Sequence, residues 1–408
     1  MSQLPRGPNS FPNPQPRVPS PQLPMRIAHI ITRLILGGAQ ENTILNCQGL
    51  IHDHGDEVVL ITGPGLGPEG SLEEDARRRG IPLRIVSAMR RAIHPWRDAA
   101  TLRELKAAIR EFRPDVVHTH SGKAGLLGRY AGWQLNVSAV VHTVHGAPFH
   151  AYQSWAAREF FRRCEMFAAK RCHAIISVAD AMTDQLVAAG VAPREKFTTI
   201  YSGMEVEPFL VADQHRQRVR RELGFDDQHI VVGKVARLFH LKGHADLIAA
   251  AEKLAGDHAQ LRFLLVGDGI LRAELESSID RAGLRDRFHF TGLVPPSRIP
   301  ELISATDLVV HTSYREGLAR ALPQALLAGR PVVSFDIDGA REVVVNNETG
   351  CLVAPGDACG LAAAIAKLAT DADLRRERAA TGRERCRERF DHRTMTKRIR
   401  ALYQSLLV

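Results

Sequence analysis

The chain has 408 residues, about twice the usual length of one domain, so two domains are expected. A hydrophobic share of 45% and a charged share of 24% are ordinary for a globular protein, and no run of eighteen apolar residues predicts a transmembrane helix. The net charge of +9 suits a nucleic acid, an anionic membrane or an acidic substrate, but no zinc-finger or RNA-binding signature accompanies it, so no nucleic-acid partner is expected.

The chain begins with a proline-rich segment, residues 1–24, which lacks the apolar core of a secretory signal. It is expected to be a disordered arm outside the folded domains. None of the six cysteines belongs to a Cys-x-x-Cys pair, which favours free thiols in a reducing compartment. These features predict a cytoplasmic protein.

Short apolar runs then alternate with helical patterns over residues 25–205. The runs are rich in β-branched residues and apolar on both faces, as parallel strands covered by helices on both sides must be. Ser71 and Glu74 have capping-box spacing at the start of a helix expected over 71–79. The alternation predicts a doubly wound parallel sheet. Its strands are expected at 26–32, 57–62, 83–87, 115–120, 139–145, 174–179 and 198–202.

The pattern restarts after a polar, charged connection over residues 206–228. The second series of strands is expected at 230–238, 262–269, 287–292, 308–313, 331–336 and 351–355. The predicted fold class is therefore α/β, with a second Rossmann-like domain over 206–391 and a C-terminal amphipathic helix over 392–408. Ligands of such sheets bind at the carboxyl ends of the strands, so both sets of strand ends are expected to face one cleft.

The first domain contains two loops that suit a ligand site. Gly37 and Gly38 lie between a strand and a helix, where glycines let backbone amides approach an anion. Further along, His118 and His120 project to the same side of one strand, and His142, His145 and His150 follow. No carboxylate or cysteine completes a metal-ligand set at characteristic spacing, so no essential metal is expected. His118, Lys123 and Arg129 are candidates for the acceptor side of the site.

The second domain contains the most specific motif, YREGLARALPQALLAGRPVVSF over residues 314–335. Glu316 follows a predicted strand, where a ligand contact is expected, and Gly317 allows close backbone approach. The block resembles the signature of the retaining GT-B glycosyltransferases of glycosyltransferase family four, in which a Glu, seven residues and a second Glu precede a Gly-x-Pro-Val-Val strand. Glu316 matches the first position, and Gln324 stands at the second.

This resemblance implies a GT-B fold and assigns roles to the motif residues. The first Glu of the family contacts the donor sugar and the second contacts the ribose hydroxyls, which places Glu316, Gly317, Leu318 and Gln324 at the donor. A glutamine still exchanges hydrogen bonds with hydroxyls, so the substitution concerns the ribose contact rather than the reaction. The stretch around Gly37 and Gly38 resembles the family's first-domain loop near the donor, and His145 resembles a family histidine that contacts the transferred sugar.

A further motif, GKVARLFHLKGHADLI over 233–248, suits a diphosphate. Arg237 ends a predicted strand, and Lys242 precedes a helix, so an arginine fork, a lysine charge and helix-end amides come together. The spacing resembles the family's Arg-x4-Lys-Gly motif, which binds the donor diphosphate, although a surface cation pair is the alternative. Gly267, after the next strand, is a further donor-side candidate.

The predicted function is transfer of a sugar from a UDP- or GDP-sugar to a glycan, lipid-linked or other hydroxyl acceptor, with retention at the anomeric carbon. Arg237 and Lys242 are expected to stabilise the leaving diphosphate, and Glu316 and His145 to position the sugar. A sugar-nucleotide epimerase on the same fold and a non-catalytic protein that binds nucleotide sugars remain the alternatives.

A basic helix expected within residues 152–173 suggests a peripheral attachment to an anionic membrane surface. Arg158, Arg162, Arg163 and Lys170 share one side of it. The apolar side, which includes Phe160, is expected to pack on the first sheet and leave only the basic side exposed.

Overall fold

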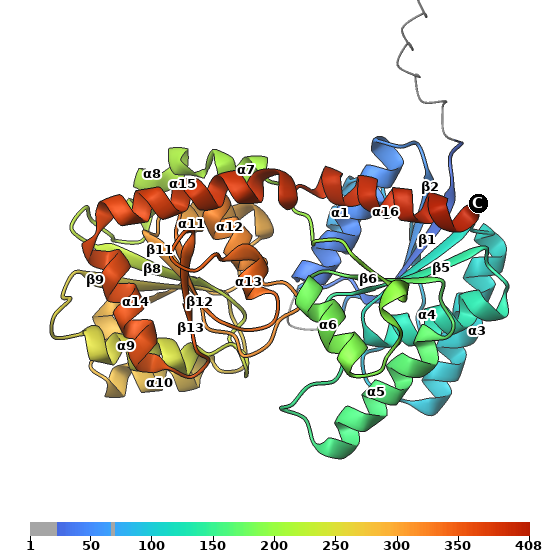
Figure 1. The fold of residues 1–408 in the computed structure, drawn as a ribbon, viewed down its shortest axis with the longest axis horizontal. Coiled ribbons are helices and arrows are strands. Elements are labelled where there is room, and N and C mark those ends of the chain that lie inside the picture. Colours follow the sequence, from blue (N-terminus) through green and yellow to red (C-terminus); the bar gives the residue numbers. More distant parts are fainter. Residues whose placement is uncertain (1–22, 67–69) are drawn as a thin grey trace, which may run out of the picture.

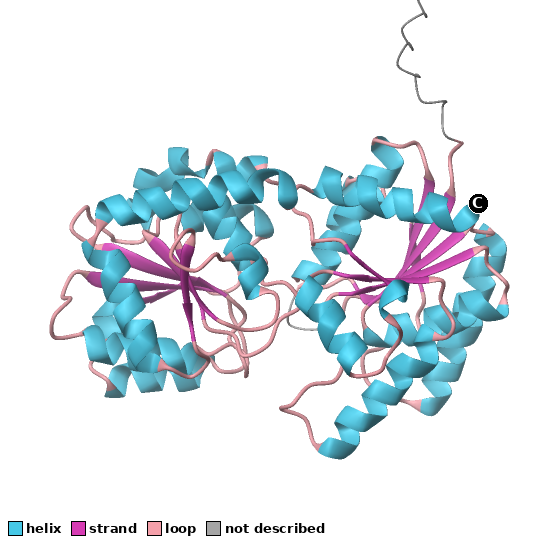
Figure 2. Cartoon of the chain, in the orientation of Figure 1, coloured by secondary structure: helices cyan, strands magenta, loops and turns pink. Residues whose placement is uncertain are grey.

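The computed structural model describes residues 23–66 and 70–408, which form two lobes, each with a parallel sheet between helices (Figures 1 and 2). This confirms the predicted α/β class with two doubly wound sheets. The predicted disordered arm, residues 1–24, lies outside the described residues except for its last two positions.

The first sheet has seven strands in the order β3-β2-β1-β4-β5-β6-β7, all paired in parallel. Its strands are β1 (Arg26–Arg33), β2 (Glu57–Gly63), β3 (Leu83–Ile85), β4 (Val116–His120), β5 (Ala139–Val144), β6 (Ala174–Ser177) and β7 (Phe197–Thr199). The helices between them are α1 (Gly38–His52), α2 (Glu73–Arg78), α3 (Pro95–Phe112), α4 (Gly122–Gln134), α5 (Trp155–Ala169) and α6 (Asp180–Ala188). The chain changes its direction of growth between β1 and β4, where sheets of this kind bind ligands.

The second sheet has six parallel strands in the order β10-β9-β8-β11-β12-β13, with the corresponding switch between β8 and β11. Its strands are β8 (Ile230–Val235), β9 (Leu261–Val266), β10 (Phe288–Phe290), β11 (Leu308–His311), β12 (Val332–Phe335) and β13 (Gly350–Val353). The helices are α9 (His244–Leu254), α10 (Arg272–Arg281), α11 (Ile299–Ser304), α12 (Ala321–Leu327), α13 (Ala340–Val343), α14 (Ala358–Thr370) and α15 (Ala372–Arg389).

Two local expectations were wrong. The polar segment 206–228 is not a simple connection, because it folds into α7 (Glu207–Leu210) and α8 (Arg216–Glu222), which are held down where Arg216 and Arg220 donate hydrogen bonds to Asp307. The capping box at the start of α2 does not form either. The helix begins two residues after Ser71, whose hydroxyl accepts a hydrogen bond from the Glu73 amide.

The last helix, α16 (His392–Leu407), returns to the first lobe and packs beside α1 (Figure 1). Its Arg400 donates to both carboxylate oxygens of Asp56, at 2.8 and 3.1 Å, and both side chains are almost fully buried. Tyr403, also buried, reaches His118 in the middle of β4. The chain therefore passes between the lobes twice, once before the second lobe and once where α16 returns to the first.

We expect Arg400→Met to destabilise the first lobe by about 3–5 kcal/mol, because it leaves the Asp56 carboxylate buried without its guanidinium partner. Urea unfolding followed by circular dichroism measures the change. The control is Arg194→Met, which breaks an ion pair with Asp184 whose two side chains are mostly exposed. Equal losses in the two variants would show that burial of the Asp56 pair does not stabilise the lobe.

Candidate active site between the two lobes

Loops that follow the carboxyl ends of strands in both lobes meet between the sheets. Gly317, after β11, touches His145, after β5, so closely that a methyl group on Gly317 would lie 2.0 Å from the His145 carbonyl oxygen. Arg320 reaches the first lobe, where it donates to the Gly38 carbonyl at 3.0 Å and pairs with Glu41 at 2.9 Å. The structure therefore brings together predicted site residues from the two domains.

A second contact between the lobes uses the start of α6. The Glu342 carboxylate, on α13 of the second lobe, accepts hydrogen bonds from the amides of Asp180 and Ala181 at 2.8 and 2.9 Å. A carboxylate there satisfies amides that have no partner within the helix and interacts favourably with the helix dipole. The lobes are also joined by one hydrophobic cluster that runs from Val178 and Ala179 to Leu318 and Ala340.

Glu316 is the centre of charge in the second-lobe part of the site. Its carboxylate forms an ion pair with Lys242 and lies 3.4 Å from Nε2 of His311, while its amide donates to Asp338 at 2.7 Å. Burial alone would raise the pKa of this carboxyl, but the Lys242 ammonium and the His311 ring outweigh burial and hold the pKa well below its usual range. Two predicted catalytic residues are thus in direct contact, and the carboxylate is ionised at neutral pH.

Beneath this pair lies a lysine that the sequence analysis did not single out. Lys234 on β8 is fully buried, and its ammonium donates to the Thr312 hydroxyl at 2.6 Å. Burial, reinforced by the nearby Lys242 charge, lowers the pKa of Lys234 from 10.5 to about 7. Its sequence signal was a lysine within a predicted, mostly apolar strand at the start of the 233–248 motif.

The glycine of the Lys-Gly motif has a clear structural reason. Gly243 has a φ of +60°, and a methyl group on it would lie 1.9 Å from the Thr312 carbonyl oxygen. Only glycine combines that backbone conformation with such close approach. Gly243 thereby sets Lys242 against the end of β11, where Glu316 follows.

Arg237 lies at the carboxyl end of β8 and is exposed. Its guanidinium stacks over the Phe239 ring at 5.0 Å and has no carboxylate partner among residues 23–66 and 70–408. Gly267, with a φ of +135°, follows β9 and packs against the Ala236 carbonyl oxygen, which a methyl group would approach to 2.3 Å. Arg237 is therefore an available cation beside a backbone that leaves no space for a side chain.

Of the three residues predicted on the acceptor side, two are fully buried and the third is largely covered. His118 and Arg129 have no exposed surface, so the prediction that they contact an acceptor is wrong in this structure. His118 is enclosed by hydrogen bonds to Tyr403 and Thr143, while Arg129 is paired at 2.8 Å with buried Glu165. Lys123 is largely covered and is ion-paired with Asp98 on α3.

The remaining donor-side candidates stay predictions. Gln324 lies half-buried on α12, the helix that follows the Glu316 loop, and Leu318 is buried in the cluster shared by the lobes. Gly37 precedes α1 with an extended backbone, so its conformation does not itself require glycine. Gly38 does need to be small, because a methyl group there would lie 2.8 Å from the Arg320 side chain.

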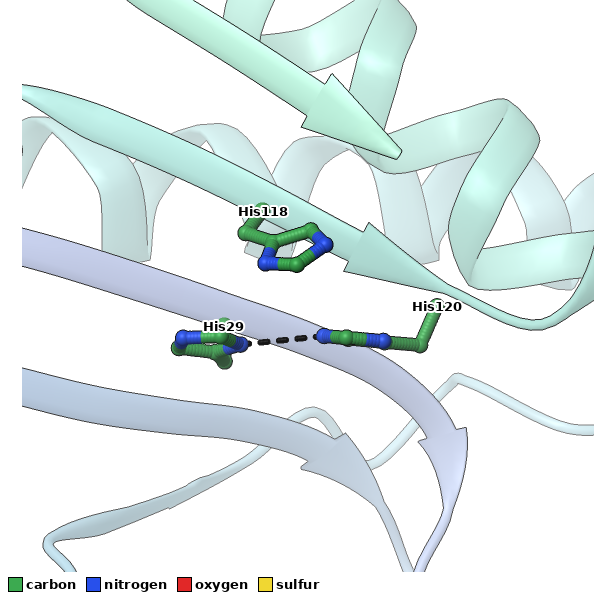
Figure 3. Close-up of side chains that lie close together, drawn as sticks. All are labelled: His29, His118 and His120. Atoms are coloured by element: carbon green, nitrogen blue, oxygen red, sulfur yellow. Dashed lines mark hydrogen bonds between the residues drawn. The ribbon is translucent and has the colours of Figure 1, made fainter. Parts of the chain in front are cut away.

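A row of imidazoles leads from His145 into the first lobe through His120 and His29, the last two of which are drawn in Figure 3. His120 Nδ1 lies 3.1 Å from His145 Nε2, and His120 Nε2 lies 2.9 Å from Nδ1 of His29, a residue that the sequence analysis missed. His29 pairs in register with His118 on the neighbouring strand, so the signal was a histidine at an inward position of a central strand. His142 lies apart from this row and bonds Thr119.

These rings are neutral at ordinary pH. Burial lowers the pKa of His29 to about 3, and burial together with the Arg320 charge lowers that of His145 to about 3. The pKa of His120 is also lowered well below 6.5, by burial and by the neighbouring histidines. The rings of the row are therefore uncharged hydrogen-bonding groups.

The sequence matches the model described as Glycosyl transferase 4-like domain over residues 38–203 and that described as Glycosyl transferases group 1 over residues 215–385. The 2-deoxystreptamine N-acetyl-D-glucosaminyltransferase of Streptomyces fradiae is 29% identical over 371 residues, which cover 84% of this chain and 85% of that protein. The UDP-Gal:alpha-D-GlcNAc-diphosphoundecaprenol alpha-1,3-galactosyltransferase of Escherichia coli is 26% identical over 350 residues, which cover 85% of this chain and 88% of that protein.

A solved structure shares the whole fold. HepE from Anabaena, in complex with UDP and glucose, superposes with a TM-score of 0.81 at 24% sequence identity, and the match covers 93% of this chain and 100% of that chain. The arrangement of both lobes is therefore one that is already known.

We expect Lys234→Met to raise stability most at low pH. The unfolded chain holds this lysine at its ordinary pKa of 10.5 and the folded chain holds it at about 7, so the unfolded state binds more protons between these values. Lys234 therefore makes stability increase as the pH rises from 7 to 10.5, and its burial is most unfavourable below 7. Thermal unfolding at about pH 6 and about pH 9 should show the larger gain of the variant at the lower pH.

The matched control is Lys253→Met, which removes an exposed lysine from α9 in the same lobe. Its difference from the parent protein should not change with pH in the way that the Lys234→Met difference does. A Lys234→Met gain that is constant across the pH range would contradict the lowered pKa of this lysine.

Proposed function

The chain belongs to the group 1 glycosyl transferases, since the two matched models together span most of its length, and on this premise we propose that it transfers a sugar from a uridine diphosphate sugar to a hydroxyl of a glycan or lipid-linked acceptor. The bond between the anomeric carbon and the diphosphate breaks, a bond to the acceptor oxygen forms, and the acceptor proton leaves with the diphosphate. The Glu316 block, which resembles that of retaining enzymes, favours retention at the anomeric carbon.

The observation that carries this proposal is the meeting of the Lys242–Glu316 ion pair with the His145 loop of the other lobe. A nucleoside diphosphate needs cations as it leaves, and the second lobe supplies two: Lys242, and Arg237, which has no carboxylate partner within the described residues. The hydroxyl groups of the sugar need hydrogen-bonding partners, which the ionised Glu316 and the neutral ring of His145 provide. The residues are thus divided between the two tasks that the reaction sets.

The uridine nucleotide and the acceptor class are supported by the relatives. The E. coli protein is named for transfer from UDP-Gal to a sugar on diphosphoundecaprenol, and HepE was crystallised with UDP. The S. fradiae protein is named for a different acceptor, 2-deoxystreptamine, so the relatives alone do not fix the acceptor of this chain. A non-catalytic role rests on Gln324 alone, and an amide keeps the hydrogen-bonding capacity that hydroxyl recognition requires.

Release of UDP from UDP-glucose, UDP-galactose and UDP-N-acetylglucosamine, with an acceptor extract present, tests the proposal directly. We expect Arg237→Ala to lower turnover by roughly 10²–10³, the usual result of losing one preorganised donor to a developing negative charge. Glu316→Gln should lower turnover as strongly while UDP itself still binds, because the lost contact is to the sugar and Lys242 keeps its charge.

Arg281→Ala is the control, since it removes an exposed arginine from α10 in the same lobe and should not change turnover. Folded Arg237→Ala with parental turnover would remove Arg237 from the reaction. A Glu316→Gln variant that loses UDP affinity as well as transfer would show that Glu316 contacts the nucleotide instead of the sugar.

We further propose that the enzyme attaches to an anionic membrane through α5 and the surface around it. No helix in the described part of the chain is long and apolar enough to cross a bilayer, so the attachment would be peripheral. The expectation that the apolar side of α5 packs inward holds only in part: Ala168 is buried and Phe161 packs on the core, but Phe160 is 52% exposed. Trp155 and Phe167, outside the predicted apolar side, are 80 and 43% exposed. Exposed aromatic rings among cations are typical of a membrane interface.

The surroundings of α5 support this attachment. An apolar groove of about 550 Å³ opens beside it, lined by residues of α3, α4 and α5 that include Leu102 and Leu127. Arg171 lies 3.5 Å from the centre of the Phe167 ring. Arg162 and Arg163 share the Glu159 carboxylate, so the exposed cations without that partner are Arg158 and Lys170.

We expect the double variant Arg158→Glu/Lys170→Glu to abolish binding to vesicles of phosphatidylglycerol and phosphatidylcholine at low salt, since each cation near such a surface contributes about 1 kcal/mol. Sedimentation with the vesicles measures binding. The control, Arg385→Glu/Arg387→Glu, changes two exposed arginines of α15 in the other lobe by the same net charge and should still bind. Parental protein that stays in the supernatant at low salt, or equal loss in both variants, would overturn the attachment through α5.

A further inference from the structure

The direction of the hydrogen bonds in the histidine row follows from its one buried nitrogen that has no partner in the described residues. His145, His120 and His29 are joined by two contacts between ring nitrogens, at 3.1 and 2.9 Å. His29 Nε2, at the inner end, is buried and has no hydrogen-bond partner in the described part of the chain. Each neutral imidazole carries one proton, so each contact is an N–H donating to a bare nitrogen, and the two contacts must run the same way.

Two arrangements satisfy this condition. In the first, Nδ1–H of His29 donates to His120, and Nδ1–H of His120 donates to Nε2 of His145, which then carries its own proton on Nδ1. In the second, every bond is reversed, His145 presents a bare Nδ1, and the buried Nε2 of His29 carries a proton with no acceptor. Orphaned buried N–H groups are rarer in proteins than orphaned acceptors, which favours the first arrangement.

We propose that His29 and His120 are positioning residues that hold His145 as the Nδ1–H tautomer, so that its ring presents a hydrogen-bond donor to an oxygen of the donor sugar. The inference rests on the proposed function, because it takes His145 to be a sugar contact. It adds that two buried residues, His120 in contact with His145 and His29 one ring further in, select the tautomer of His145. His29 itself is fully buried on β1, an inner strand that borders the switch point.

A bound metal ion is the alternative interpretation of the cluster of His29, His118 and His120. Nitrogens of His29, His118 and His120 lie within 4.8 Å of one another, close enough to hold one ion. Yet both nitrogens of His118 are engaged, by Tyr403 and Thr143, and both nitrogens of His120 are engaged by other rings. Metal binding would break most of these bonds, whereas the hydrogen-bonded row leaves a single buried nitrogen, Nε2 of His29, without a partner in the described residues.

Two-bond ¹H–¹⁵N correlation spectra of the ¹⁵N-histidine-labelled protein decide the tautomer, with His145 assigned by its absence from His145→Asn. We expect the proton on Nδ1. His29→Phe, which keeps a ring but removes its nitrogens, should give His145 a mixture of tautomers and lower turnover by roughly 3- to 10-fold, the range for one lost hydrogen bond. His29→Asn places an amide N–H near the former Nδ1 and should restore both properties.

His142→Phe is the matched control, because it removes a buried histidine of the same sheet that is not in the row. It should leave the His145 spectrum unchanged. A parental His145 protonated on Nε2, or an unchanged His145 tautomer in His29→Phe, would overturn the proposal, and the first result needs no variant to fold. One equivalent of bound zinc in the purified protein, with activity lost in EDTA, would establish the metal instead. Absence of any UDP release by the parental enzyme would refute the proposed function and leave the tautomer result standing.

Discussion

The partly buried carboxylate of Glu316 is the constraint around which the site is built. A charge at that depth must be balanced, and Lys242 balances it. Lys242 can do so only because Gly243 bends the chain against the end of β11, and that bend depends on the absence of a side chain. A diphosphate brought to this place would compete with Glu316 for the same ammonium. Arg237, which has no carboxylate partner in the described residues, then becomes the cation that is free to bind it first.

The contact between lobes follows from the same segment. Gly317 comes directly after Glu316 and lies against the His145 carbonyl oxygen, so the loop that carries Glu316 is in direct contact with a loop of the other lobe. Arg320 and Glu342, further along, bond to backbone groups of the first lobe. The segment from Glu316 to Glu342 thus supplies the carboxylate, the close contact of Gly317 and the polar bonds that join the second lobe to the first.

Much of this was predictable from the sequence because strand ends are visible in it. The apolar runs located the strands, and Glu316, Arg237 and His145 each follow one, where parallel sheets place ligands. The burial of a side chain could not be predicted in this way. The alternation of residues gives the side of the strand on which His118 lies, but it does not show that Tyr403, from the distant helix α16, encloses it. The prediction that Arg129 contacts an acceptor was wrong for the same reason, since its partner Glu165 lies on another helix. Lys234 and His29 were missed because each lies within an otherwise apolar strand that local pattern assigns wholly to the core.

Those two missed residues share a physical feature that sets them apart from the rest of the core. A valine at either position would satisfy a doubly covered strand without any polar group to desolvate. Lys234 instead keeps a lowered pKa beneath Glu316, and His29 keeps a nitrogen without a partner. Groups that weaken the fold where they stand are expected at functional sites, where the lost stability is offset by what they do. Both lie on an inner strand that borders the switch point of its sheet, and each touches the site through one intermediate side chain: Thr312 in one lobe and His120 in the other. The two lobes therefore share one feature, a buried polar residue on the strand beside the switch point that supports the site residues from behind.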